Sequence, residues 1–173
     1  MTIVFFCTSG FAVPSLVKLS KFHDIAAVVT KPDKPKGRNL KPAPSIVKIK
    51  ADSMGIPVIS IDDMPAAQAL AALKKYKADL FVVIAYGKIL SREILSLPKL
   101  YSIGLHASLL PKYRGASPIN WAILNGEEKT GVTVFTLSRK TDAGEIIVQK
   151  DSDILSSDNA ATLSEKLSNL RAN

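Results

Sequence analysis

The sequence contains few of the residues that build disulfides and metal centres. Among its 173 residues, Cys7 is the only cysteine, and His23 and His106 are the only histidines. One cysteine excludes an internal disulfide, and two isolated histidines without a cysteine cluster do not match the ligand spacing of a zinc site. We therefore expect Cys7 to be a buried core residue in a cytoplasmic protein that holds no metal.

Long hydrophobic runs and nucleotide-binding motifs are also absent. No apolar run approaches the ~18 residues that cross a membrane. Met1 is followed almost at once by Ile3–Phe6, which favours a first strand over a signal peptide. The chain has no Gly-x-Gly-x-x-Gly after this strand and no Walker sequence, which argues against a dinucleotide or P-loop site. We expect no membrane partner.

Acidic residues are scarce in residues 31–50, and the positive charge of the chain is concentrated there. The net charge is +8, and residues 31–50 hold seven Lys and Arg against one acid, Asp33. Pro32, Pro35, Pro42 and Pro44 stiffen the same segment, so we expect a basic, proline-rich loop over Lys31–Pro44. A localised basic segment indicates a polyanionic partner such as a nucleic acid, although a solvated loop is the alternative.

Alternating apolar patterns predict an α/β fold. The predicted strands cover 2–7, 25–30, 56–59, 80–85, 101–105, 132–137 and 145–149. The predicted helices cover 15–21, 45–54, 65–76, 91–97, 117–124 and 159–170, the last with Asp158 as its cap. This order predicts a Rossmann-like, doubly wound and mostly parallel sheet. Turns at Thr130–Gly131 and at 141–144 predict an antiparallel addition at the end.

Two residues are the main candidates for chemistry. His106 would lie at the carboxyl end of a buried strand, where α/β sheets place ligands, and a neutral imidazole can accept a proton from an amine. A hydrogen-bonded structural histidine is the alternative. Asp142 lies in a turn and could orient His106 if the two meet. Ser108 lacks a nucleophile elbow, so no covalent catalysis is expected, and Trp121 is expected in the core.

The motifs around these residues resemble the folate-dependent formyltransferase family. The resemblance rests on His106-Ala107-Ser108-Leu109-Leu110-Pro111, Arg114-Gly115, Pro118, Thr130-Gly131-Val132-Thr133 and Asp142-Ala143-Gly144. Within the family, the methionyl-tRNA formyltransferases are matched by residues 11–16, 28–38, 44–48 and 82–87. The resemblance covers essentially the whole chain. It implies a formyltransferase fold and transfer of a formyl group from 10-formyltetrahydrofolate to the amino group of initiator methionyl-tRNA.

The resemblance also implies roles for individual residues. The general base falls on His106 and its partner on Asp142. Folate binding falls on Ser108, Leu109, Leu110, Pro111, Ile84, Tyr86 and Gly87, with the pterin near 83–87 and the loop 139–144. The loop that contacts the tRNA acceptor arm falls on about 33–41, with Lys34, Lys36, Arg38 and Lys41 as tRNA-binding residues. This segment coincides with the basic segment found from charge alone.

One position departs from the family in the catalytic motif. The family has an Asn two residues before the histidine, as a donor to the oxyanion of the tetrahedral intermediate, and this chain has Gly104. Loss of one such donor typically costs ~10²–10³ in rate. Three explanations stay open: a water or backbone N–H replaces the donor, the residue was changed deliberately, or the protein binds its ligands and reacts slowly. Cys7-Thr8-Ser9-Gly10 also departs from the family's first turn.

Other activities remain as alternatives. A sugar-nucleotide N-formyltransferase has the same fold and suits residues 113–121, but it needs no basic arm. A folate- or tRNA-binding remnant without catalysis is the alternative from a different class. Glycinamide ribonucleotide transformylase is disfavoured because its Gly-rich turn after the first strand is absent. We expect 1–173 to be a catalytic domain slightly truncated at its C-terminus, without the family's C-terminal β-barrel tRNA-binding domain, and monomeric.

Overall fold

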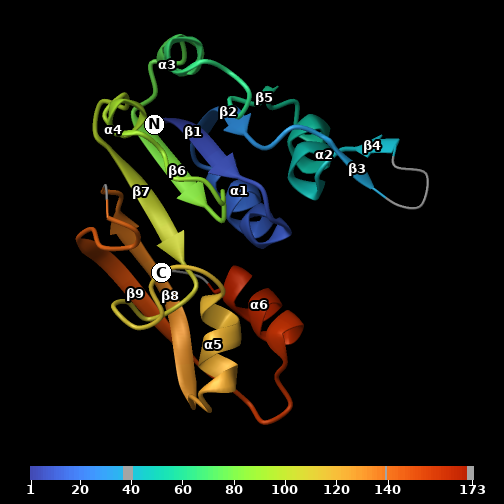
Figure 1. The fold of residues 1–173 in the computed structure, drawn as a ribbon, viewed down its shortest axis with the longest axis vertical. Coiled ribbons are helices and arrows are strands. Elements are labelled where there is room, and N and C mark those ends of the chain that lie inside the picture. The colour runs from blue at the N-terminus through green and yellow to red at the C-terminus, as the bar shows by residue number, and fades with distance from the viewer. Residues whose placement is uncertain (37–40, 139, 171–173) are drawn as a thin grey trace.

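The fold is built on one seven-stranded sheet. The computed structural model describes residues 1–36, 41–138 and 140–170, and the side chains of 34–42 are outside this description. The strand order is β5-β2-β1-β6-β7-β8-β9. The first five of these strands are parallel, whereas β8 runs antiparallel to β7 and β9 antiparallel to β8. The doubly wound sheet with an antiparallel addition is therefore confirmed (Figure 1).

The element bounds follow the sequence patterns closely. The strands of the sheet are β1 Thr2–Cys7, β2 Asp24–Val29, β5 Val58–Ile59, β6 Leu80–Ile84, β7 Tyr101–His106, β8 Lys129–Thr136 and β9 Ile146–Asp153. The α-helices are α1 Val13–Leu19, α2 Ile46–Ser53, α3 Ala66–Lys74, α4 Arg92–Leu95, α5 Pro118–Leu124 and α6 Ala160–Ser168. A short 3₁₀ turn, η1 Gly10–Ala12, leads into α1. Each predicted strand and helix is present, with ends shifted by a few residues.

Four local predictions were wrong. Lys31–Pro44 is not all loop, because β3 Lys34–Lys36 and β4 Lys41–Ala43 pair as an antiparallel hairpin. Thr130–Gly131 lies inside β8 rather than in a turn, and Gly131 is needed there because a Cβ would overlap the carbonyl of Lys150 on β9. Trp121 is 52% exposed rather than in the core. Asn159, not Asp158, caps α6.

The side chain of Asn159 caps α6 because its Oδ1 accepts the backbone N–H groups of Ala161 and Thr162. Thr162 completes a capping box by accepting the N–H of Asn159. Asp158 serves the preceding turn instead, where its carboxylate accepts the N–H of Leu155. The general rule that an Asx side chain precedes the helix was sound, but the rule does not choose between two adjacent Asx residues.

Alternation along the central strands produces two apolar layers. In β1, Ile3, Phe5 and Cys7 face α1 and α2, whereas Val4 and Phe6 face α3 and α4. All five side chains are fully buried, as expected for a strand covered on both faces. Cys7 is thus the core residue that the sequence predicted, and burial raises the pKa of its thiol to about 12.

A third apolar cluster joins the two C-terminal helices to the sheet. Val132 of β8 packs with Leu163 and Leu167 of α6, and Ile119 and Ile123 of α5 pack against them. Figure 1 shows α5 and α6 side by side at the end of the molecule where β8 begins. This packing places the start of α5 next to the carboxyl end of β7, where His106 lies.

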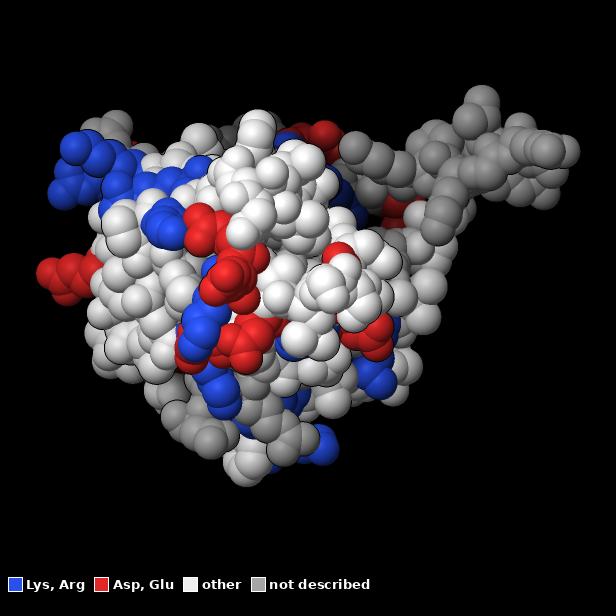
Figure 2. Space-filling model, turned by 90° about the horizontal axis from the view of Figure 1, so that it is seen from below, with Lys and Arg blue, Asp and Glu red and all other residues white. Residues whose placement is uncertain are grey.

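The surface at the end of the molecule that carries α5, α6 and the start of β8 has mixed charge. On the face in Figure 2, Lys and Arg side chains are interspersed with Asp and Glu, without a continuous area of one sign. Ion pairs such as Lys129–Asp151 and Lys166–Asp158 are typical of the C-terminal part of the chain. Among the described residues, no helix has the length and apolarity required to cross a bilayer.

Candidate active site

A cavity of about 680 Å³ opens at the carboxyl ends of β1, β6 and β7. Its walls come from the residues after each of these strands, from the start of α5 and from the segment after β8. The lining includes Ser9, Phe11, Val83, Tyr86–Leu90, Gly104–Ala107, Gly115–Asn120, Phe135 and Thr141–Asp142. This is the crevice where the winding of the sheet reverses between β1 and β6, and such a crevice is where α/β folds bind ligands.

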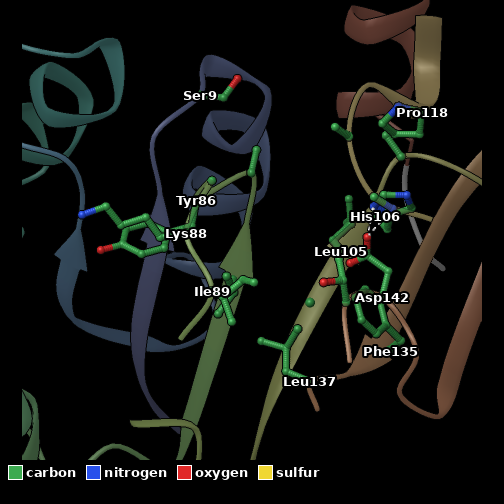
Figure 3. A pocket seen from close by; sticks show the side chains of 18 of the residues that line it. Ser9, Tyr86, Lys88, Ile89, Leu105, His106, Pro118, Phe135, Leu137 and Asp142 are labelled. Atoms are coloured by element: carbon green, nitrogen blue, oxygen red, sulfur yellow. Dashed lines mark hydrogen bonds and ion pairs between the residues drawn. The ribbon is translucent and has the colours of Figure 1, made fainter. Parts of the chain in front are cut away.

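His106 and Asp142 meet in this cavity. His106 ends β7, and its Nδ1 lies 3.4 Å from Oδ2 of Asp142, which comes from the turn between β8 and β9. Figure 3 shows the two side chains pointing toward one another. The other ring nitrogen, Nε2, lies 2.8 Å from the carbonyl oxygen of Tyr113 and, since a carbonyl only accepts, Nε2 carries a proton in this arrangement.

The loop that follows β7 is tied to this pair. The N–H of Gly115 donates to the same Oδ2 of Asp142 at 2.9 Å. Tyr113 and Ser117 both have φ of 56°, a left-handed conformation that is costly for residues with a Cβ. The Tyr113 hydroxyl donates to Glu127 at 2.7 Å, and this hydrogen bond, followed by the one from Lys112, lowers the pKa of Glu127. The loop is therefore anchored to Asp142 through Gly115 and to Glu127 through Tyr113.

Gly104 lies in the middle of β7 and lines the same cavity. It pairs with Val83 on one side and Phe135 on the other, so its backbone groups belong to the sheet ladder. A Cβ at Gly104 would lie 2.9 Å from Cδ2 of Leu137 and 3.0 Å from the Phe135 ring. An Asn at this position would therefore require the end of the half-buried Leu137 side chain and the Phe135 ring to shift.

The chain was compared with known proteins. The profile of the formyl transferase family matches residues 2–173. This chain belongs to the formyl transferase family. Methionyl-tRNA formyltransferase from Thermodesulfovibrio yellowstonii is 52% identical over 169 residues, which is 96% of this chain and 54% of that protein. The enzyme of the same name from Caldanaerobacter subterraneus subsp. tengcongensis is 47% identical over 99% of this chain and 56% of that protein.

Solved structures confirm the formyltransferase fold. Phosphoribosylglycinamide formyltransferase from Bacillus halodurans superposes with a TM-score of 0.78 at 24% identity, covering 96% of this chain and 86% of that one. Glycinamide ribonucleotide transformylase 1 from Geobacillus kaustophilus gives 0.78 at 22% identity, covering 96% and 90%. At this level of sequence identity, the structural similarity supports the fold alone. The chain spans about half the length of the curated relatives it matches.

The Ser108–Pro111 segment of this formyl transferase does not line the cavity. Ser108 is fully buried and its hydroxyl donates to the carbonyl of Lys112 at 2.6 Å. The hydroxyl of Thr133 on β8 donates to the carbonyl of Ser108 and accepts the N–H of Leu110. Gln149 on β9 donates to both Thr133 and the Leu110 carbonyl. These contacts hold the segment against β8 and β9, and its role in folate binding stays a prediction.

The other predicted folate residues, Ile84, Tyr86 and Gly87, do not all line the cavity. Tyr86 and Gly87 line the cavity, whereas Ile84 is 2% exposed and belongs to the core that faces α1 and α2. The hydroxyl of Tyr86 donates to Asp62 at 2.9 Å, and Nζ of Lys88 lies 3.0 Å from the other oxygen of Asp62. Burial and the contact with Asp62 raise the pKa of Tyr86. The sequence analysis missed Asp62 and Lys88, because only the fold brings residue 62 beside residue 88.

Three of the four predicted tRNA-binding residues, Lys34, Lys36 and Lys41, lie on β3 or β4. Arg38 lies outside the described residues, and for Lys34, Lys36 and Lys41 the structure describes the backbone alone. Near the base of the hairpin, Lys48 of α2 pairs with Asp33 at 2.7 Å. Among the described residues, no group of three His, Cys, Asp or Glu side chains could hold a metal ion.

Proposed function

We propose that this chain transfers the formyl group of 10-formyltetrahydrofolate to the amino group of initiator methionyl-tRNA. The observation that carries the proposal is the placement of His106 against Asp142 inside the main cavity of a formyl transferase chain. The choice of methionyl-tRNA among possible acceptors rests on the relatives, which are called methionyl-tRNA formyltransferases, and on the basic segment 31–50.

In the proposed reaction, His106 removes the proton of the acceptor amine as its nitrogen attacks the formyl carbon. The folate co-substrate supplies the formyl group. As the tetrahedral intermediate collapses, the bond between the formyl carbon and N10 breaks, and the imidazolium of His106 returns its proton to N10. Nε2 of His106 now donates to the Tyr113 carbonyl, so the incoming amine must displace that carbonyl. Once Nε2 is released from the carbonyl, exchange with solvent moves the ring proton to Nδ1, facing Asp142, and leaves Nε2 free to accept the proton of the amine. Asp142 then stabilises the imidazolium formed during transfer.

The oxyanion lacks the side-chain donor that the family motif supplies at position 104. The backbone of Gly104 is held in the sheet, and Leu137 and Phe135 occupy the adjoining space. We therefore propose a chemical step slower than that of a relative with Asn at this position. The fold and the His106–Asp142 pair do not depend on the missing donor.

The remaining parts of the proposal follow from the family. We propose that residues 1–173 form a catalytic domain, that tRNA contacts Lys34, Lys36, Arg38 and Lys41, and that the reaction takes place in the cytoplasm without a metal. Tyr86 and Gly87 are the proposed folate contacts inside the cavity, whose volume is in the range of small-molecule sites. A monomer remains a prediction.

The decisive experiment compares acceptors under single-turnover conditions. We expect formyl transfer from 10-formyltetrahydrofolate to methionyl-tRNA, and none to glycinamide ribonucleotide or to an amino-sugar nucleotide. Formylation of the amino sugar alone would support the sugar-nucleotide alternative. Folate binding without transfer to any acceptor, in this chain and in a Gly104→Asn/Leu137→Ala double variant, would show a binding protein and overturn the proposal.

A further inference from the structure

Two lysines from different strands reach the same turn at the rim of the cavity. Lys31 follows β2, and Lys88 follows β6. The Cβ position at Gly87 lies 3.2 Å from Nζ of Lys31, so the Lys31 ammonium lies over the residue directly before Lys88. Figure 3 shows Lys88 extending from the cavity wall on the side away from His106. One lysine therefore belongs to the turn after β6, and a second, Lys31, places its ammonium against that turn.

Lys88 is held in place by a buried carboxylate. Its Nζ lies 3.0 Å from Asp62 Oδ2, and the Asp62 side chain is only 6% exposed while that of Lys88 is 47% exposed. The second oxygen of Asp62 accepts from the Tyr86 hydroxyl. Asp62 is thus engaged on both oxygens and fixes the position of the Lys88 ammonium, which still faces solvent and lines the cavity.

Lys31 contributes a charge that Asp62 does not balance. The structure gives Lys31 no ion-pair partner within the described residues, and the nearby Asp33 is paired with Lys48. Two hydroxyls at the same edge, those of Thr30 after β2 and Ser60 after β5, are buried and have no hydrogen-bond partner there. Two ammonium groups against one carboxylate favour an anionic ligand.

We propose that Lys31 and Lys88 bind a backbone phosphate of the RNA acceptor end as it passes from the β3–β4 hairpin to His106. The inference rests on the proposed function and adds a site to it. Lys31 connects β2 to the hairpin segment, and Lys88 lines the cavity that contains His106, so the two residues mark the path between the basic segment and the reacting atoms. Lysine ammonium groups bind phosphate as point charges, which suits a flexible single strand.

The test measures binding of an initiator acceptor minihelix to the chain over a range of salt concentrations. Lys31→Ala, which breaks no described ion pair, should weaken binding several-fold and reduce the slope of log K against log salt by about 0.7. Lys88→Ala alone would leave Asp62 buried without its cation, so it is made together with Asp62→Asn. Asp62→Asn alone serves as its reference, and the double variant should show a similar loss relative to it.

A matched control lies at the opposite edge of the sheet. Lys99 pairs with Asp79 at the amino ends of β6 and β7, much as Lys88 pairs with Asp62, and Lys99→Ala should leave the salt slope unchanged. If the wild-type chain binds the minihelix and Lys31→Ala binds it with an unchanged slope, the phosphate site is wrong while the proposed function stands. If the wild-type chain shows no salt-dependent binding, the tRNA substrate itself is refuted and the site with it.

A second arm distinguishes RNA phosphate from the carboxylates of a folate tail, which present similar anionic oxygens. Dissociation constants for monoglutamyl and polyglutamyl tetrahydrofolate are compared between wild type and Lys31→Ala. We expect equal, small effects on both folates. A loss confined to the polyglutamyl form, with the minihelix slope unchanged, would assign the two lysines to the folate tail and overturn the RNA assignment.

Discussion

Oδ2 of Asp142 is shared between His106 and the loop that covers it. The oxygen lies 3.4 Å from His106 Nδ1 and accepts the N–H of Gly115 at 2.9 Å. Asp142 itself has φ of 47°. The turn therefore holds it in a left-handed conformation, which costs more energy for a residue with a side chain than for Gly. One carboxylate oxygen thus orients the proposed base and fixes the loop that carries Tyr113.

Asp142→Asn is expected to reduce the rate of formyl transfer on the order of 10²–10⁴-fold, because the carboxamide cannot stabilise the imidazolium. The Asn oxygen can still accept from Gly115, so the fold should be retained. Single-turnover rates and circular dichroism check both statements, with the exposed Asp151→Asn as the control. A variant that retains the wild-type rate would refute the assigned role of Asp142.

Gly104→Asn is expected to act differently with and without room for the new side chain. The added atoms meet Leu137 and Phe135, so the single variant should lose about 1–3 kcal/mol of stability and gain little activity. Combined with Leu137→Ala, the Asn can occupy the cavity wall, and the rate should rise by about 10²–10³-fold over Leu137→Ala alone. Thermal unfolding and single-turnover kinetics measure the two effects. Equal rates in the double variant and in Leu137→Ala would exclude an oxyanion role for this position.

Thr133→Val is expected to destabilise the chain by about 2 kcal/mol or more, since it leaves the Leu110 N–H and the Ser108 carbonyl buried without this partner. Thr130, on the same strand, has a buried hydroxyl without a hydrogen-bond partner among the described groups. Thr130→Val should therefore be neutral or stabilising, which makes it a matched control. Denaturant unfolding at one pH compares the two, and equal losses would contradict the role given to Thr133.

Replacing Lys34, Lys36 and Arg38 together with Ala should weaken tRNA binding and reduce its salt slope by about 2–3, as expected for three lost phosphate contacts. The control is the triple substitution of Lys74, Lys75 and Lys77 by Ala. These lysines are exposed at the end of α3. Their substitution removes the same charge from another part of the surface. A similar change of slope in both triple variants would indicate a general charge effect rather than a binding arm.

The Cys7 thiol should be unreactive toward Ellman's reagent at pH 8 in the folded chain and react at once in guanidinium. Burial raises its pKa from 9.0 to about 12, so the folded chain holds the neutral, inaccessible thiol. Because of this shift, the buried neutral thiol of Cys7 makes its full contribution to the free energy of unfolding below pH 9. That contribution is lost as the pH rises toward 12. Rapid reaction of the folded chain would show that β1 is less buried than the structure indicates.

How far the sequence predicts the site can be judged at particular residues. The sequence predicted a strand over 101–105 that leads into His106, and β7 ends one residue later, at His106 itself, because local alternation and the following Ser, Pro and Gly residues define both ends. The resemblance assigns Ser108–Pro111 to folate binding, and the structure adds that this segment is hydrogen-bonded to Thr133 and Gln149. The sequence carries no signal for the direction of such a loop, because its hydrogen-bond partners lie over 20 residues away.

By itself, the sequence determined the order of strands and helices, the core character of Cys7 and β1, the basic segment, and the residues His106 and Asp142 as candidates. These depend on periodicity, turn residues and residue chemistry, which act over short stretches of chain. Only the tertiary structure decided that Asp142 reaches His106, that Leu137 and Phe135 close the space beside Gly104, and that Lys31 and Lys88 converge at Gly87. Each of these depends on strands that are distant in sequence and adjacent in the sheet, and adjacency is fixed by packing of the whole fold.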